Sequence, residues 1–213
     1  MDDQQLLAWT AEHRVLVADT VDSLGEPHAS DPTLCAGWDV RTLTAHLLQP
    51  IRVPSWRFLL TAARVRSMAR ACDVIAERLA DRPLREITAE LRDRAGTPAR
   101  PWYIGAAGPF ADSCIHLRDL AQPQGLPVTV PVERWAAVLD IIASPRGQES
   151  FLPSKGFLDG LRWEATDTGW AWGEGPVVRS TAEALAMTMS GRTAYLGQVG
   201  GEGAGRLAER TTA

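Results

Sequence analysis

The stretch ADSCIHLRDL, residues 111–120, places Asp112 and His116 four residues apart, and Asp119 follows three residues later. It belongs to the longer segment GPFADSCIHLRDLAQ, which follows a loop rich in Pro and Gly and ends before Pro123. This pattern predicts a helix. Residues i and i+4 project from the same face of a helix, so both side chains can bind one ion. The same spacing also occurs by chance on ordinary helices, so a third ligand from another helix is needed.

The chain has only four histidines from which that ligand can come: His13, His28, His46 and His116. His28 lies in a polar loop and is a weak candidate. His13 lies between a glutamate and an arginine, so we expect it on a solvated helix face. His46 differs, because it lies in TLTAHLL, a mostly apolar helix where an unpaired imidazole is costly to bury. It is either a metal ligand or a hydrogen-bonded histidine of the core.

The first half of the chain has the periodicity of helices. Asp39 is a good N-cap for the helix that carries His46, and Pro50 bounds its far end. The other predicted helices are 6–24, 53–81 with a possible break near its middle, 84–95 and 131–142.

After Pro145 the pattern changes. Large and polar residues alternate on both sides of Thr168 and Gly169, which predicts a β-hairpin. A third strand is expected at 177–180 and helices at 181–192 and 204–210. The sequence therefore predicts an α+β protein with a helical bundle over residues 1–145 and a small α/β domain over 155–213. The segment SPRGQESFLPSKG is the expected linker.

Composition excludes several classes of partner. The net charge of −4 shows no basic excess, which argues against binding to nucleic acid or to an anionic membrane. No run of 18 apolar residues is present, and the acidic start lacks the basic n-region of a secretory signal. The three cysteines (Cys35, Cys72 and Cys114) have no disulfide spacing and favour reduced thiols. We therefore expect a cytoplasmic protein that is a monomer or a homodimer.

Three segments in order resemble the mycothiol-dependent maleylpyruvate isomerase family, a branch of the DinB-like helical bundles. They are PTLCAGWDVRTLTAHLL (32–48), DSCIHLRDLAQPQGLP (112–127) and GLRWEATDTGWAWGEGPVVRSTAEALAMTMSGR (160–192). The resemblance covers most of the chain. It implies a DinB-like four-helix bundle that holds a divalent metal, followed by the family's small C-terminal domain.

The resemblance also implies a ligand set, which consists of His46, Asp112 and His116. Two imidazoles and a carboxylate suit zinc, but also iron, nickel or cobalt. Related proteins often carry Glu at the acid position, so Asp112 leaves the identity of the metal open. Arg192 is the arginine that the resemblance places near the metal, where it would bind a carboxylate; the alternative is a cation that stabilises a helix C-terminus. Asp119 either orients a ligand or pairs with a surface group.

The resemblance implies an enzyme whose metal activates a low-molecular-weight thiol, mycothiol, for attack on a small electrophilic substrate. The reaction would be an isomerisation or a thiol transfer. Mycothiol is the thiol of actinobacteria, and the preference for Arg over Lys suits that origin. The alternative is a DinB-like metal-binding protein without mycothiol chemistry, with an accessory or stress-related role or as a metal hydrolase. Cys35 and Cys114 are not expected to be catalytic.

Overall fold

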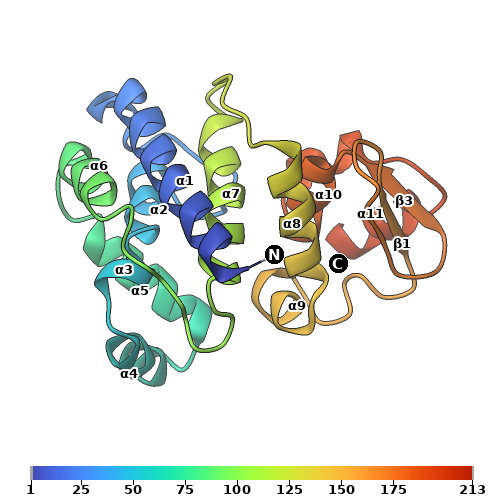
Figure 1. Ribbon diagram of the computed structural model, residues 1–213, viewed down its shortest axis with the longest axis horizontal. Coiled ribbons are helices and arrows are strands. Elements are labelled where there is room, and N and C mark those ends of the chain that lie inside the picture. The colour runs from blue at the N-terminus through green and yellow to red at the C-terminus, as the bar shows by residue number, and fades with distance from the viewer. Residues whose placement is uncertain (1, 213) are drawn as a thin grey trace. The chain divides into compact units, whose positions relative to one another are not determined.

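The computed structural model describes residues 2–212, which form two compact units, one ending at Val128 and the other beginning at Thr129 (Figure 1). Helices dominate the described part of the chain, and one small sheet lies in the second unit. The predicted α+β class is therefore confirmed.

The first unit is a bundle in which α1 contacts α2, α6 and α7, and α2 contacts α5, α6 and α7. Apolar side chains that face inward from α1 and α7 are fully buried, among them Val17, Val21, Leu117 and Leu120. The elements of this unit are α1 (Asp3–Leu24), the 3-10 helix η1 (Glu26–His28), α2 (Val40–His46), α3 (Gln49–Arg52), α4 (Ser55–Val65), α5 (Met68–Leu79), α6 (Leu84–Asp93) and α7 (Ala107–Ala121).

The predicted helix at 53–81 is divided into α4 and α5, as its possible break suggested. Arg66 lies between them with φ +57°, a left-handed conformation that a continuous helix does not contain. Ser67 then caps α5, because its hydroxyl accepts a hydrogen bond from the amide of Arg70 at 3.2 Å. The turn at these two residues lets α4 pack back against α5.

The second unit contains the sheet, with strand order β2-β1-β3. Strands β1 (Arg162–Ala165) and β2 (Ala171–Trp172) are antiparallel and form the expected hairpin, while β3 (Val177–Ser180) pairs with β1 in parallel. The remaining elements are α8 (Val132–Ala143), α9 (Pro145–Phe151), α10 (Ala182–Met189), the 3-10 helix η2 (Thr193–Gln198) and α11 (Ala204–Thr212). Trp135 and Trp163 are among its largest buried side chains.

The segment expected to be a linker contains helix α9. Ser144 caps this helix, because its hydroxyl accepts from the amide of Gly147 at 3.1 Å. A Cβ atom at Gly147 would lie 1.7 Å from the carbonyl oxygen of Ile141, so only glycine permits the close approach of α9 to α8. Pro145 and Gly147 therefore lie in a tight helix–helix corner, which the composition of the segment alone does not distinguish from a flexible linker.

Helix α8 packs against α10 in the second unit. The boundary between the two compact units does not establish where a domain begins or ends. The domain limits 1–145 and 155–213 therefore stay predictions. Among residues 2–212, no helix combines the length and the apolar character that crossing a bilayer requires.

Candidate metal centre

His46 is the last residue of α2, and the start of that helix determines where the imidazole lies. The Asp39 side chain accepts a hydrogen bond from the amide of Thr42 at 2.7 Å, which confirms the predicted N-cap. Leu43 and Ala45 are fully buried and fix the rotation of the helix against its neighbours. The His46 side chain is therefore held at the edge of the core, with 12% of its surface exposed.

Helix α7 supplies the two other residues of the predicted set. Asp112 Oδ1 lies 3.2 Å from His116 Nε2, and Asp112 Oδ2 lies 3.1 Å from His46 Nε2. The two imidazole rings meet edge to face with centroids 5.1 Å apart. The three side chains offer ligand atoms that all lie within 4.8 Å of one another. The structure thus brings together residues that are 66 positions apart in the sequence.

Trp38 packs against both imidazoles. Its ring centroid lies 4.6 Å from that of His46 and 5.8 Å from that of His116. The indole Nε1 donates a hydrogen bond to Asp73 Oδ1 at 3.2 Å, which anchors the ring to α5. Trp38 therefore limits the orientations of the histidines and excludes water from one side of the cluster.

The charges of this cluster shift the pKa values of its members. Burial alone would raise the pKa of Asp112, but the charges of His116 and His46 and their hydrogen bonds hold it far below its ordinary value. Burial opposes the charged form of His116, yet Asp112 and then Asp119 outweigh it and raise the pKa of His116 to about 9. In the metal-free protein at neutral pH, the Asp112 carboxylate and the His116 imidazolium therefore form a partly buried ion pair.

The field of Asp112 extends to neighbouring groups. Burial and then the Asp112 charge raise the pKa of the Cys72 thiol to about 12. The same two causes, in the same order, raise the pKa of Tyr103 to about 12. Both groups stay protonated near neutral pH, so neither is an anion that competes with Asp112 for a cation.

The arrangement fits a zinc ion. Bond lengths of about 2.0–2.1 Å and tetrahedral angles separate neighbouring ligand atoms by about 3.3 Å. Each imidazole nitrogen is already close to that distance from one oxygen of Asp112, His46 Nε2 at 3.1 Å from Oδ2 and His116 Nε2 at 3.2 Å from Oδ1. His46 Nδ1 is buried and has no hydrogen-bond partner among the described residues, so Nε2 carries the polar contact of this ring. Two imidazole nitrogens and a carboxylate, whose potential ligand atoms lie within 4.8 Å of one another, form a suitable donor set.

Asp119 lies on the other side of the His116 ring. Its Oδ2 is 2.9 Å from His116 Nδ1, and the residue is fully buried. Of the two predicted roles for Asp119, pairing at the surface is therefore wrong. Cys35 joins these two residues in a second group whose potential ligand atoms lie within 4.8 Å of one another.

Sequence reasoning did not find that Cys35 lies beside His116 and Asp119. It treated this cysteine as a small apolar residue of the loop before α2, and the residue is in fact half-buried. The amide of Leu34 donates to the carbonyl oxygen of Asp119 at 3.1 Å, which brings the cysteine to α7. No local spacing in the sequence encodes this contact between the loop and the helix.

The other histidines lie outside the candidate set. His28 is exposed and its Nδ1 is 2.7 Å from Asp31. His13 is completely buried, so the expectation of a solvated position is wrong. Its Nδ1 lies 3.1 Å from Ser113 Oγ and 3.3 Å from the Sγ of Cys114, which is itself buried.

Arg192 lies in the second unit, just after α10. Its guanidinium donates to the carbonyl oxygen of Ser190 at 2.6 Å, and its amide donates to that of Met187 at 2.9 Å. These bonds satisfy carbonyls at the C-terminal end of α10, as a cation at a helix terminus does. The predicted role of Arg192 beside a metal stays a prediction.

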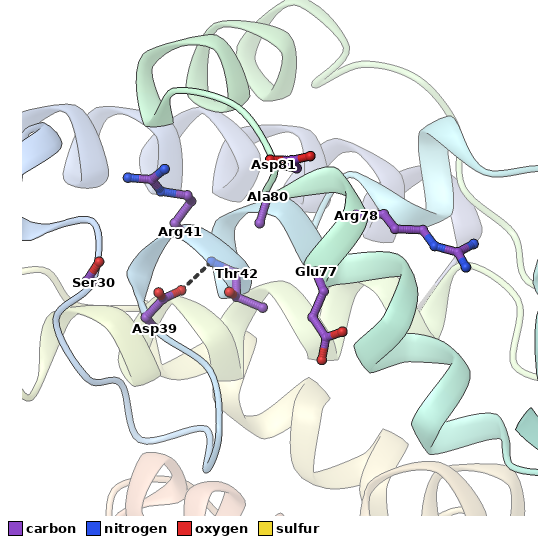
Figure 2. Close-up of a pocket in the computed structure, with 8 residues that line it drawn as sticks. All are labelled: Ser30, Asp39, Arg41, Thr42, Glu77, Arg78, Ala80 and Asp81. Carbon is purple, nitrogen blue, oxygen red and sulfur yellow. Dashed lines mark hydrogen bonds between the residues drawn. The ribbon is translucent and has the colours of Figure 1, made fainter.

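A surface cavity of about 570 Å³ lies at the opposite end of α2 (Figure 2). Its charged lining is already engaged in part: Asp39 caps α2, and Arg41 pairs with Glu26 at 2.6 Å. The complete lining is Ser30, Asp39, Arg41, Thr42, Glu77, Arg78, Ala80 and Asp81, and none of these residues belongs to the candidate metal set. We therefore assign no function to this cavity.

No family model matches this chain, and no curated protein matches it in sequence. Two solved structures match its fold. One is a crystal structure of a histidine-to-alanine mutant of the mycothiol-dependent maleylpyruvate isomerase, with a TM-score of 0.64 and 12% identity. The other is a crystal structure of the mycothiol-dependent maleylpyruvate isomerase, with a TM-score of 0.59 and 14% identity. Each match covers 95% of this chain and 93% of the other. The chain therefore has the fold of this isomerase along nearly its whole length.

Proposed function

We propose that the chain binds a divalent metal, preferably zinc, through His46, Asp112 and His116. The observation that carries this proposal is the convergence of two imidazole nitrogens on the two oxygens of one partly buried carboxylate, that of Asp112. A carboxylate between two imidazoles is costly to remove from water unless its negative charge is balanced. A divalent cation would balance that charge better than the single proton of the Asp112–His116 ion pair does. The match in fold to a mycothiol-dependent isomerase supports a related function for this chain.

We further propose that the protein is an enzyme that uses mycothiol to modify a small electrophilic substrate. A bound zinc ion lowers the pKa of a thiol that coordinates it, which supplies a thiolate at neutral pH. The protein's own residues prepare the centre. Asp112 stays ionised, Trp38 covers one side of both imidazoles, and Asp119 accepts a hydrogen bond from Nδ1 of His116.

The class of reaction follows from what a thiolate does with an electrophile. Addition to a conjugated double bond followed by elimination isomerises the bond, and displacement or epoxide opening transfers the thiol. Arg192 is proposed to bind a carboxylate of the substrate, on the basis of the family resemblance. An Arg192→Lys variant that retains the charge and an Arg192→Gln variant that removes it distinguish this role. A substrate-binding role predicts that KM rises far more in the Gln variant while metal content stays unchanged.

The test of the proposed function begins with metal analysis of the purified protein and cobalt substitution. We expect one metal per chain, and we expect its loss in His46→Ala and His116→Ala variants. His28→Ala is the matched control, because His28 is an exposed histidine of the same unit. A wild-type protein that binds no zinc or cobalt would refute the metal centre.

The thiol is tested on the cobalt form. Coordination of mycothiol adds a sulfur-to-cobalt charge-transfer band in the near ultraviolet, and we expect this band to saturate with one thiol per site. An unchanged spectrum in the presence of excess mycothiol would favour the alternative function, a metal-binding protein without mycothiol chemistry.

A further inference from the structure

Asp119 carries a buried carboxylate that the proposed set of metal ligands does not use. It lies three residues after His116 on α7, has no exposed surface, and its Oδ2 is 2.9 Å from His116 Nδ1. Burying a carboxylate costs several kcal/mol unless hydrogen bonds and charge compensate for it. The burial of this side chain therefore indicates a specific interaction inside the protein, and not solvation at the surface.

Both ring nitrogens of His116 lie next to carboxylates. Nε2 faces Asp112 Oδ1 at 3.2 Å, and Nδ1 faces Asp119 Oδ2 at 2.9 Å. A metal ion binds an imidazole nitrogen that carries no proton, so a metal on Nε2 requires the proton on Nδ1. Asp119 is positioned to accept a hydrogen bond from a protonated Nδ1. This hydrogen bond selects the Nδ1-protonated tautomer and fixes the plane of the ring.

The contrast with His46 supports this reading. His46 Nδ1 is buried without a hydrogen-bond partner among the described residues, and the ring is held by packing against Trp38. His116 is thus fixed by hydrogen bonding at both nitrogens, whereas His46 is fixed on one side only.

Asp119 is itself held in place by the loop that precedes α2. Its carbonyl oxygen accepts the amide of Leu34 at 3.1 Å, and the Thr33 hydroxyl donates to the carbonyl of Trp38 at 2.8 Å. The loop that packs Trp38 on His46 therefore also contacts the residue that supports His116. The loop 33–38 and α7 therefore connect Trp38, which packs on His46, with Asp119, which supports His116.

We propose that Asp119 is a positioning residue that holds His116 as the Nδ1-protonated tautomer and so sets the metal affinity of the centre. The inference rests on the proposed metal centre. In this inference Asp119 acts on the metal site by orienting His116, and it does not itself bind the metal. A metal held by Cys35, His116 and Asp119 would instead need a bare Nδ1 and would break the Asp119–His116 hydrogen bond.

The test compares zinc affinity in wild-type protein and in Asp119→Asn, by competition with a chromophoric chelator. Loss of a supporting carboxylate is expected to weaken zinc binding about 10- to 100-fold. Asp31→Asn is the matched control, since it removes an acid that pairs in the same way, at a spacing of three residues, with the exposed His28 outside the candidate set. We expect its zinc affinity to stay close to that of the wild type. Cobalt absorption is the second readout, and we expect its visible bands to shift in Asp119→Asn only.

A merely structural role would have a different signature. It would lower the melting temperature of the metal-free protein and leave the zinc affinity of the folded fraction unchanged. Equal zinc affinities and identical cobalt spectra in wild type and Asp119→Asn would overturn the inference. If wild type itself binds no metal, the proposed function fails, and this outcome is read from the wild-type arm alone.

A measurement on the wild type keeps the inference testable should Asp119→Asn fail to fold. Nitrogen-15 NMR of the zinc-loaded protein, with labelled histidine, reports which nitrogen of His116 carries the proton. We expect a protonated, hydrogen-bonded Nδ1 and a zinc-bound Nε2. Zinc on Nδ1 would overturn the assignment and favour the group that contains Cys35.

Discussion

The His116–Asp112 ion pair makes the stability of the metal-free protein depend on pH in a defined direction. The pKa of His116 is raised to about 9 in the folded protein, against an ordinary value of 6.5. A raised pKa means that the folded state holds the proton more tightly than the unfolded chain. The stabilisation is therefore complete below pH 6.5 and is lost as the pH rises to about 9. Each pKa unit corresponds to 1.36 kcal/mol, so the loss is about 3 kcal/mol.

The assay is urea unfolding of chelator-treated protein at intervals between pH 6 and pH 9.5. His116→Gln is the reference, since it removes the titrating ring and leaves the other ionisable groups in place. We expect the free energy of unfolding of the wild type to fall by about 3 kcal/mol more than that of the variant. Asp112 adds no slope in this range, because its pKa is lowered and the carboxylate is already ionised. Parallel pH profiles for the two proteins would refute the reasoning.

Three further predictions follow from single contacts. In Gly147→Ala the new Cβ would lie 1.7 Å from the Ile141 carbonyl oxygen, so we expect a loss of about 1–3 kcal/mol in thermal unfolding; Gly169→Ala, where no atom lies within 4 Å of the added Cβ, is the control. The raised pKa of Cys72 predicts that iodoacetamide at pH 8 labels this thiol far more slowly in folded than in urea-unfolded protein, and equal rates by mass spectrometry would contradict it. Trp163→Ala removes a fully buried indole and should cost about 3–5 kcal/mol, measured by urea unfolding, with a smaller loss contradicting the packing.

The parts of the fold that local patterns encode could be predicted from the sequence. Apolar spacing predicted the longer helices, Asp39 marked the start of α2, and the turn at Thr168 and Gly169 predicted the β-hairpin, whereas the short helices α3 and α9 were not predicted. The proximity of Asp112 to His116 also followed from the spacing, because four residues return to the same face of a helix.

The errors arose where distant segments meet. His13 has charged neighbours in the sequence, yet Arg14 is buried too, because its guanidinium donates to the carbonyl oxygens of Ala95 at 2.9 Å and Thr97 at 2.8 Å. The carbonyl oxygen of Ala95, 81 residues away in the sequence, thus accepts a hydrogen bond from a buried guanidinium that would otherwise need water. The approach of Cys35 to α7 depends in the same way on a backbone hydrogen bond between segments, for which the local sequence contains no signal.

Helix α7 supplies two of the three candidate ligands together with the supporting acid Asp119, and α2 supplies the third ligand. Asp112, His116 and Asp119 follow one another at spacings of four and three, so a single helix face fixes a ligand pair and the acid that orients it. His46 arrives from a short helix and depends on Trp38 and on the capped start of α2 for its position. Since Leu34 connects that region to the Asp119 carbonyl, a change in the loop should disturb both imidazoles together. The proposed metal centre is therefore best regarded as one unit made of α7 and the 33–38 loop, with His46 as the candidate ligand whose position depends most on tertiary packing.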